Sequence, residues 1–230
     1  MLNKLKKIKP KHILEMLVIL ISFIPGMILR LIKRDIWIVA ENGDDAKDNG
    51  YAFFKYAMEN KSKKDIYYVI TKKSIYYDKL KKYNKNLLYK NSLKHNIYTI
   101  ASTKYISSQI GSGLPFPELV FNFQGTFIYR FKSIFLQHGI TQNKVQCLLK
   151  NESKVDLFCC AGNKEYDFVI NELGYNEENA KKTGFCRYDL LKDESKNSNK
   201  ILMMFTWRKQ FENDEKAFLD SKYYSTIQDL

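Results

Sequence analysis

Polar residues that could move a proton or bind phosphate follow several apolar runs of this 230-residue sequence. His138 and Gly139 come directly after the apolar run 133–137, and the chain contains only three histidines. Imidazole accepts a proton readily near neutral pH, and glycine lets a ligand approach the backbone closely. In a parallel α/β sheet, ligands bind where strands end. His138 is therefore a candidate general base, and the alternative is an ordinary polar loop residue.

Other polar side chains occupy equivalent positions after apolar runs. The guanidinium fork of arginine suits phosphate, and a neighbouring hydroxyl can add a hydrogen bond. A base combined with phosphate-binding arginines fits phosphoryl or nucleotide-sugar transfer, and the spacing alone does not separate these reactions. We expect the following residues to converge on one sheet edge as substrate-binding groups: Glu41, Gly139, Thr141, Arg187, Asp189, Thr206 and Arg208.

Weaker patterns have simpler interpretations. Gly111-Ser112-Gly113 lacks the full dinucleotide fingerprint and is interpreted as a turn. The acidic loop 44–48 could hold a divalent ion, although a solvated loop is preferred, so we predict no metal site. Cys159 and Cys160 are adjacent in a predicted strand and would point to opposite faces, which favours two buried thiols in a reducing compartment.

The elements that must position these residues alternate along the chain. We expect an α/β fold with a mainly parallel sheet, and the segment 117–123 remains ambiguous. The predicted strands are 36–41, 65–71, 86–89, 104–108, 133–137 and 154–162, with a shorter one near 180. The predicted helices are 50–60, 74–83, 92–103, starting at the cap Ser92, and 164–174, ending at Gly174.

The expected domain plan has four parts. Residues 1–34 form a basic and apolar segment, and 35–192 form a Rossmann-like domain. The polar stretch 193–200 is a linker, and 201–230 begin a second domain with a strand at 201–207 and one or two helices at 212–230.

The net charge of +13 is concentrated in two regions. Residues 1–34 carry eight Lys/Arg and one Glu, and residues 55–94 carry twelve Lys and three acidic residues. These regions favour an anionic surface or a polyanionic substrate. Nucleic acid is a poor candidate because no zinc-finger, RNP-type or basic-zipper motif is present.

The apolar run 16–29 is marginal for a membrane span, and we expect Pro25-Gly26 to interrupt it. Arg30, Lys33 and Arg34 follow it, whereas a signal-peptide cleavage site does not. Basic residues on both sides suit a segment lying in an anionic leaflet. We therefore expect peripheral or monotopic attachment; the alternatives are a true span and a buried helix.

Five motifs in order resemble the CDP-glycerol:poly(glycerophosphate) glycerophosphotransferase family of teichoic-acid and capsule biosynthesis. They are ENGDDAKDNGYAFFKY, IFLQHGIT, DLFCCAGNKEYDFV, TGFCRYDLL and ILMMFTWR, within residues 35–230. The resemblance implies a GT-B-like fold of two Rossmann-like domains at the cytoplasmic face of the membrane. It also implies transfer of glycerol or ribitol phosphate from CDP-glycerol or CDP-ribitol to a lipid-linked polyol-phosphate polymer, releasing CMP. His138 would be the base acting on the acceptor hydroxyl, and the basic arm would hold the enzyme on the bilayer.

The sequence departs from the family pattern in two places and lacks a further part. Cys186 stands where the family's G-[YF]-P-R-x-D motif has proline, and Phe205 replaces the proline of P-T-W-R. The second histidine and the D-Y-S-S-like segment of the donor half are missing, so we expect this chain to be truncated and inactive alone. The alternatives are a GT-B glycosyltransferase that uses a nucleotide sugar and a non-catalytic membrane-bound remnant.

Overall fold

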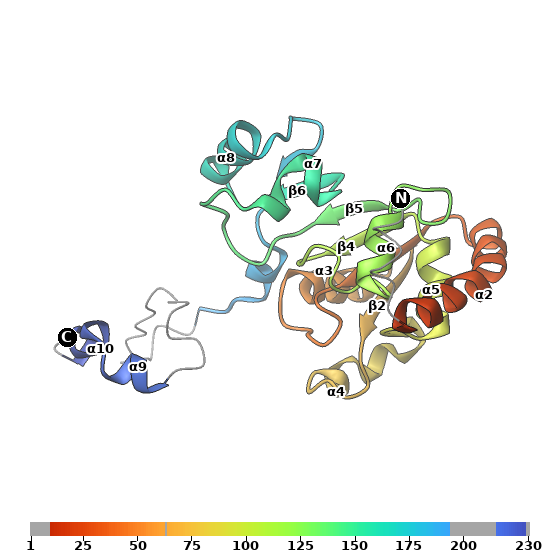
Figure 1. Ribbon diagram of the computed structural model, residues 1–230, viewed down its shortest axis with the longest axis horizontal. Coiled ribbons are helices and arrows are strands. Elements are labelled where there is room, and N and C mark those ends of the chain that lie inside the picture. The colour runs from red at the N-terminus through yellow and green to blue at the C-terminus, as the bar shows by residue number, and fades with distance from the viewer. Residues whose placement is uncertain (1–9, 63, 194–214, 229–230) are drawn as a thin grey trace. The chain divides into compact units, whose positions relative to one another are not determined.

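Seven parallel strands form the sheet of residues 36–182, in the spatial order β3-β2-β1-β4-β5-β6-β7. The computed structural model describes residues 10–62, 64–193 and 215–228 (Figure 1). The strands are β1 Ile36–Ala40, β2 Asp65–Ile70, β3 Leu87–Tyr89, β4 Lys104–Ser107, β5 Lys132–Phe135, β6 Leu157–Cys160 and β7 Ala180–Lys182.

The order of the strands reverses between β1 and β4. The chain proceeds outward from β1 through β2 to β3, then returns to β4 and proceeds through β5, β6 and β7 on the other side. This is the strand arrangement of doubly wound nucleotide-binding folds, in which ligands bind at the carboxyl ends beside the reversal. The predicted α/β fold with a Rossmann-like domain is confirmed.

Helices and short helical segments connect the strands. The longer helices of this part are α2 Pro10–Ile32, α3 Asn49–Glu59, α5 Leu93–Ala101, α6 Pro117–Phe123 and α8 Asn163–Leu173. Short segments are α4 Tyr77–Leu80, η1 Lys81–Asn86, η2 Gln146–Leu148, α7 Lys150–Ser153 and η3 Cys186–Leu190. The predicted caps are confirmed, because Ser92 Oγ accepts the His95 N–H and Gly174 ends α8 at φ +77°.

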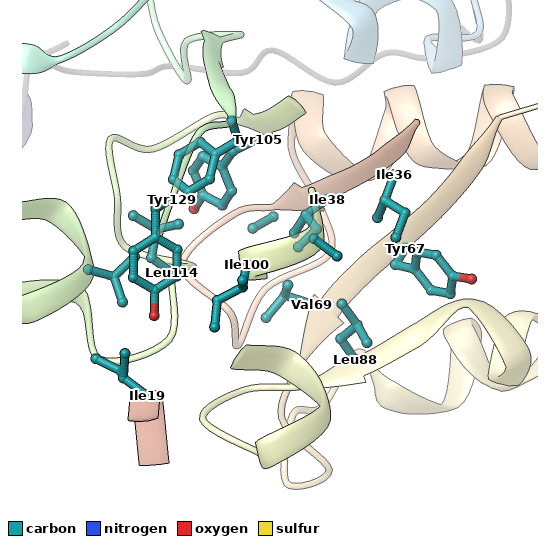
Figure 2. Close-up of a cluster of buried hydrophobic side chains, with 14 residues drawn as sticks. Ile19, Ile36, Ile38, Tyr67, Val69, Leu88, Ile100, Tyr105, Leu114 and Tyr129 are labelled. Atoms are coloured by element: carbon teal, nitrogen blue, oxygen red, sulfur yellow. The ribbon is translucent and has the colours of Figure 1, made fainter. Parts of the chain in front are cut away.

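Apolar side chains cover both faces of the sheet. Alternate residues of β1 to β4 form one cluster together with Ile19 of α2 and Ile100 of α5 (Figure 2). The intervening strand residues pack against Phe54 of α3 on the other face. Cys159 belongs to the α3 side and Cys160 packs with α8, so the prediction of two buried thiols on opposite faces is confirmed.

Two local predictions were wrong. The predicted helix 74–83 is the single turn α4 followed by the 3-10 segment η1. Leu80 and three tyrosines of this stretch pack against the core, yet the backbone leaves helical geometry at Tyr83, with φ −104° and ψ 24°. Helix α2 runs through Pro25 without a break. It is 23 residues long, or about 34 Å, and the stretch Lys11–Ile32 is long and apolar enough to cross a membrane by length and composition.

Helix α2 packs along α5, and the two helices approach closely at Gly26 (Figure 1). A Cβ at Gly26 would lie 2.6 Å from Cγ2 of Ile100, so a larger residue would push the helices apart. Asn96 donates to the Val18 carbonyl, and Arg30 donates to the Ile128 carbonyl at 3.0 Å. The inner side of α2 is therefore bound to the sheet domain.

The chain divides into two compact units, residues 1–191 and 192–230. In the second unit the described elements are the helices α9 Glu215–Leu219 and α10 Lys222–Gln228. The predicted strand 201–207, and with it Thr206 and Arg208, lies outside the described residues.

Candidate functional site

His138 lies on the surface after the carboxyl end of β5, one strand away from the reversal between β1 and β4. Its Nδ1 is 3.0 Å from the carbonyl oxygen of Ser108, which follows β4. Because a carbonyl oxygen can only accept, Nδ1 must carry the proton of the neutral ring. Nε2 then has a free lone pair on an exposed side chain, which is the arrangement a general base needs.

The residue before His138 turns the chain at this point. Gln137 has φ +65°, a left-handed conformation that is uncommon for residues other than glycine. Its buried side chain donates to Thr141 Oγ1 at 2.7 Å and to Glu165 Oε1 at 2.8 Å. Glu165 also accepts the backbone N–H groups of Thr141 and Ala161, both at 2.6 Å. These bonds hold the loop 137–141 in one conformation.

A second set of bonds connects this loop to α3 and η3. The fully buried Asn49 donates to the carbonyls of Leu136 at 3.3 Å and Gln137 at 2.8 Å, and accepts the Arg187 N–H at 3.0 Å. Nη1 of Arg187 donates to the His138 carbonyl at 3.0 Å and also pairs with Asp48, the N-cap of α3. Three segments far apart in the sequence thus fix the backbone at His138.

Arg187 mainly connects these segments to one another. Its side chain is 29% exposed, and its guanidinium lies 4.7 Å from the centre of the Phe185 ring. Within the described residues its hydrogen bonds to protein atoms use Nη1 and leave the other guanidinium N–H groups available. The predicted phosphate-binding role fits this geometry, but only the guanidinium N–H groups other than those on Nη1 would be left to contact a phosphate.

Glu41 lies beneath the site and does not face it. Its carboxylate is buried and accepts the backbone N–H groups of Lys47, Asp48 and Tyr51 at 2.8 to 3.1 Å. Burial raises the pKa of Glu41, and the three hydrogen bonds partly offset that rise. The sequence predicted that this carboxylate contacts the substrate. In the structure it instead binds the backbone of the loop 42–48 and the start of α3.

The remaining predicted residues fall in different places. Thr141 lines a cavity of about 630 Å³ between the loop 140–142, the start of α8 and Tyr188. Gly139 faces open space, since a Cβ there would meet no atom within 4 Å. Asp189 is exposed and lines a separate cavity of about 360 Å³ on the α3 side. The structure therefore brings His138, Gly139, Thr141 and Arg187 together and leaves Asp189 apart.

The acidic loop 44–48 is occupied by protein contacts. Asp45 accepts from Asn42, Asp44 accepts from Thr71, and Asp48 pairs with Arg187. No group of three or more His, Cys, Asp or Glu side chains suited to a metal ion occurs in the part of the chain that the structure describes. The Gly111-Ser112-Gly113 segment is a turn, in which Gly113 packs against Ala40 of β1 and donates to Tyr105.

Four residues that support the site were missed by the sequence analysis: Asn49, Ser108, Gln137 and Glu165. The hydroxyl of Ser108 is buried and has no hydrogen-bond partner among the described residues. Gln137 ends an apolar run and Asn49 ends a polar loop, and neither position identifies a hydrogen-bond partner.

Comparisons with known proteins show one family match and two similar proteins whose names refer to teichoic acid. Residues 24–223 match the family model of CDP-glycerol:poly(glycerophosphate) glycerophosphotransferase. The minor teichoic acid biosynthesis protein GgaB of Bacillus subtilis (strain 168) is 33% identical over 207 residues, which cover 84% of this chain and 23% of that protein. A solved structure of the wall teichoic acid polymerase TagF aligns with 80% of this chain and 49% of its own, at 9% identity and a TM-score of 0.45.

The chain spans about a quarter of the length of GgaB. The family match, in contrast, extends over most of the chain and includes His138 and Arg187. The chain belongs to the CDP-glycerol:poly(glycerophosphate) glycerophosphotransferase family.

Proposed function

We propose that this chain is the acceptor-side part of a transferase that moves glycerol phosphate, or ribitol phosphate, from a CDP-alditol to a teichoic-acid-like or capsular polymer. Family membership supports the reaction class and the donor. The single observation that carries the role of this chain is the exposed His138, whose Nδ1–H is held by the Ser108 carbonyl.

The reaction requires a deprotonated acceptor oxygen. His138 Nε2 takes the proton of the acceptor hydroxyl as that oxygen attacks the phosphorus that bears the alditol. A phosphodiester bond to the acceptor forms, the bond to the bridging oxygen breaks, and CMP leaves with that oxygen. Catalysis in such transfers comes mainly from positioning and from stabilising charge on the phosphoryl oxygens.

The neighbours of His138 would bind the acceptor. The cavity of about 630 Å³ beside Thr141 can take the end of a polyol-phosphate chain, and the open side of Gly139 leaves room for it. The free guanidinium N–H groups of Arg187 would contact a phosphate. The donor would be bound by a second Rossmann-like domain in a GT-B arrangement, to which Thr206 and Arg208 would belong.

The second part of the proposal concerns the membrane. Helix α2 is bound to the domain along one side, and its other side exposes large apolar residues, with Leu20 69% and Leu31 77% exposed. Lys33 and the exposed Arg34 follow at its end. A continuous exposed apolar surface with basic residues at its rim is typical of attachment to one leaflet. We place the enzyme at the cytoplasmic face of the cell membrane as a peripheral or monotopic protein with a lipid-linked acceptor.

The test of the reaction is CMP release from CDP-glycerol in a protein that carries these residues together with a donor-binding half. His138→Ala should reduce turnover strongly, whereas undiminished turnover would refute the assigned base. Parallel reactions with CDP-ribitol and UDP-sugars identify the donor, and a preference for a UDP-sugar would favour a glycosyltransferase instead.

A further inference from the structure

A basic pocket lies at the amino ends of β5 and β6, on the opposite edge of the sheet from His138. It has a volume of about 380 Å³, and its lining contains four cationic side chains, Arg130, Lys132, Lys150 and Lys154, and one carboxylate, Asp156. The carboxylate is already used, because it accepts from Lys132 at 3.1 Å and from the Ser133 N–H at 2.8 Å. The pocket therefore has an excess of positive charge.

Three of these cations lack a counterion in the described part of the chain. Lys154 Nζ donates to the carbonyl of Phe121 at 2.6 Å, Lys150 Nζ donates to the carbonyl of Val155, and Arg130 is exposed without an ion pair. Arg30 lies close by, and its pKa is lowered by burial and then by the charge of Arg130. An anion bound here would meet three positive charges that have no carboxylate partner among the described residues.

An apolar groove lies on the other side of the turn that bounds this pocket. It has a volume of about 690 Å³ and is lined almost entirely by apolar side chains, among them Leu17, Leu20 and Phe23 of α2, and Phe123 and Phe127 near the turn. The rings of Phe23 and Phe127 meet edge to face at 5.8 Å. The groove opens onto the exposed apolar side of α2.

The turn 123–129 connects the two sites. Phe123, Phe127 and Ile128 line the apolar groove, whereas Gln124 and Gly125 line the basic pocket. The turn is closed by the Gly125 N–H bonded to the Tyr129 carbonyl at 2.8 Å, and Gln124 donates to the Lys154 carbonyl at 2.7 Å. A short ordered segment thus presents apolar side chains on one side and borders cations on the other.

We propose that this turn is the binding site of an anionic phospholipid, with its acyl chain along the groove of α2 and its phosphate headgroup in the pocket of Arg130, Lys150 and Lys154. Charge complementarity selects this occupant: an apolar segment of protein would fill the groove and leave the cations unpaired, whereas an anionic phospholipid satisfies both. The inference rests on the proposed membrane attachment and adds lipid selectivity to it.

The experiment is flotation of the 230-residue protein with phosphatidylcholine vesicles, prepared with and without a minor fraction of phosphatidylglycerol. The wild type should bind both and prefer those containing phosphatidylglycerol. The double substitution Arg130→Gln/Lys154→Gln should reduce the preference for vesicles with phosphatidylglycerol by about five-fold for each cation removed. Binding to pure phosphatidylcholine vesicles should stay unchanged. The matched control is Lys72→Gln/Lys73→Gln, which removes the same charge from exposed positions after β2.

The possible outcomes separate the two proposals. An equal loss in both double variants would attribute the preference to general surface charge and overturn the headgroup site. Unchanged flotation of Leu20→Glu/Ile24→Glu on all vesicles would overturn the attachment itself. Should Lys154→Gln unfold the turn, as thermal unfolding would reveal, Arg130→Gln alone decides, because its side chain makes no bond that the fold needs.

Discussion

Two histidines of this protein are held by the backbone in opposite ways. His138 Nδ1 donates to the Ser108 carbonyl, so Nε2 keeps its lone pair on an exposed ring. His95 Nδ1 accepts the Asn91 N–H at 3.2 Å, so Nε2 carries the proton, and that N–H is buried without a partner among the described residues. The same side chain thus takes one tautomer at the surface and the other in the interior.

The difference separates a residue suited to proton transfer from a residue suited to packing. His95 is fully buried in α5, and burial, followed by the nearby charge of Lys90, lowers its pKa to about 3. It is therefore neutral throughout the physiological range and has no access to a substrate. Exposure and an oriented ring, more than residue type, make His138 the candidate base.

Removing the base tests this comparison most strongly. His138→Ala should reduce CMP release by about 10²- to 10⁴-fold, the usual contribution of a positioned acid or base. The free energy of unfolding should hardly change, because the side chain is exposed and makes one hydrogen bond. His95→Gln is the matched variant, which should keep turnover per folded molecule. Equal turnover losses in the two variants would contradict the assignment.

Lowering the pH should decrease the free energy of unfolding because of the buried His95. The folded pKa of His95 is about 3 and the unfolded value is about 6.5, so the unfolded state binds the extra proton between these values. Stability is then complete above pH 6.5 and falls as pH decreases toward 3, by about 3 kcal/mol between pH 7 and 4.5. Urea unfolding at a series of pH values should show this loss in the wild type and not in His95→Gln. Parallel curves for the two proteins would show that another group is responsible.

The next largest effect concerns the backbone that carries His138. Asn49→Ala leaves two buried carbonyls and the Arg187 N–H without their partner. We expect a loss of about 2 kcal/mol in unfolding free energy and a decrease of about ten-fold or more in kcat. Asn60→Ala, which removes an exposed amide at the end of α3, is the control. A stability loss with unchanged kcat would mean that His138 keeps its position without Asn49.

Sequence patterns predicted the parts of this structure that depend on neighbouring residues. Apolar runs ending at polar residues gave β1 and β5 and therefore the place of His138, and the Ser92 cap was readable in the same way. The hydrogen bonds that hold the backbone at His138 could not be predicted from the sequence. Asn49 bonds to the Gln137 carbonyl, 88 residues away, and Gln137 bonds to Glu165, 28 residues away.

The two wrong helix predictions have the same origin. The lysine-rich run 74–83 appeared helical, and Leu80 with nearby tyrosines does pack against the core, yet the backbone leaves helical geometry at Tyr83. Pro25 appeared to interrupt the apolar run, yet contacts with α5 hold the helix together on both sides of it. Tertiary packing decides such cases, and packing is invisible to local composition.

The smallest expected effect concerns Ser108, whose carbonyl orients His138 while its own hydroxyl is buried and unpaired. Ser108→Ala keeps the carbonyl and removes the unpaired hydroxyl, so we expect a gain of up to about 1 kcal/mol in unfolding free energy. Turnover should stay within a factor of about two, since the imidazole tautomer depends on the backbone atom. Thermal unfolding and CMP release measured on one preparation check both statements. A large loss of turnover without loss of stability would instead mean that the Ser108 hydroxyl contacts the reactants. The unpaired hydroxyl beside His138 would then have a role in the reaction, whereas the unpaired Nε2–H of the buried His95 has none.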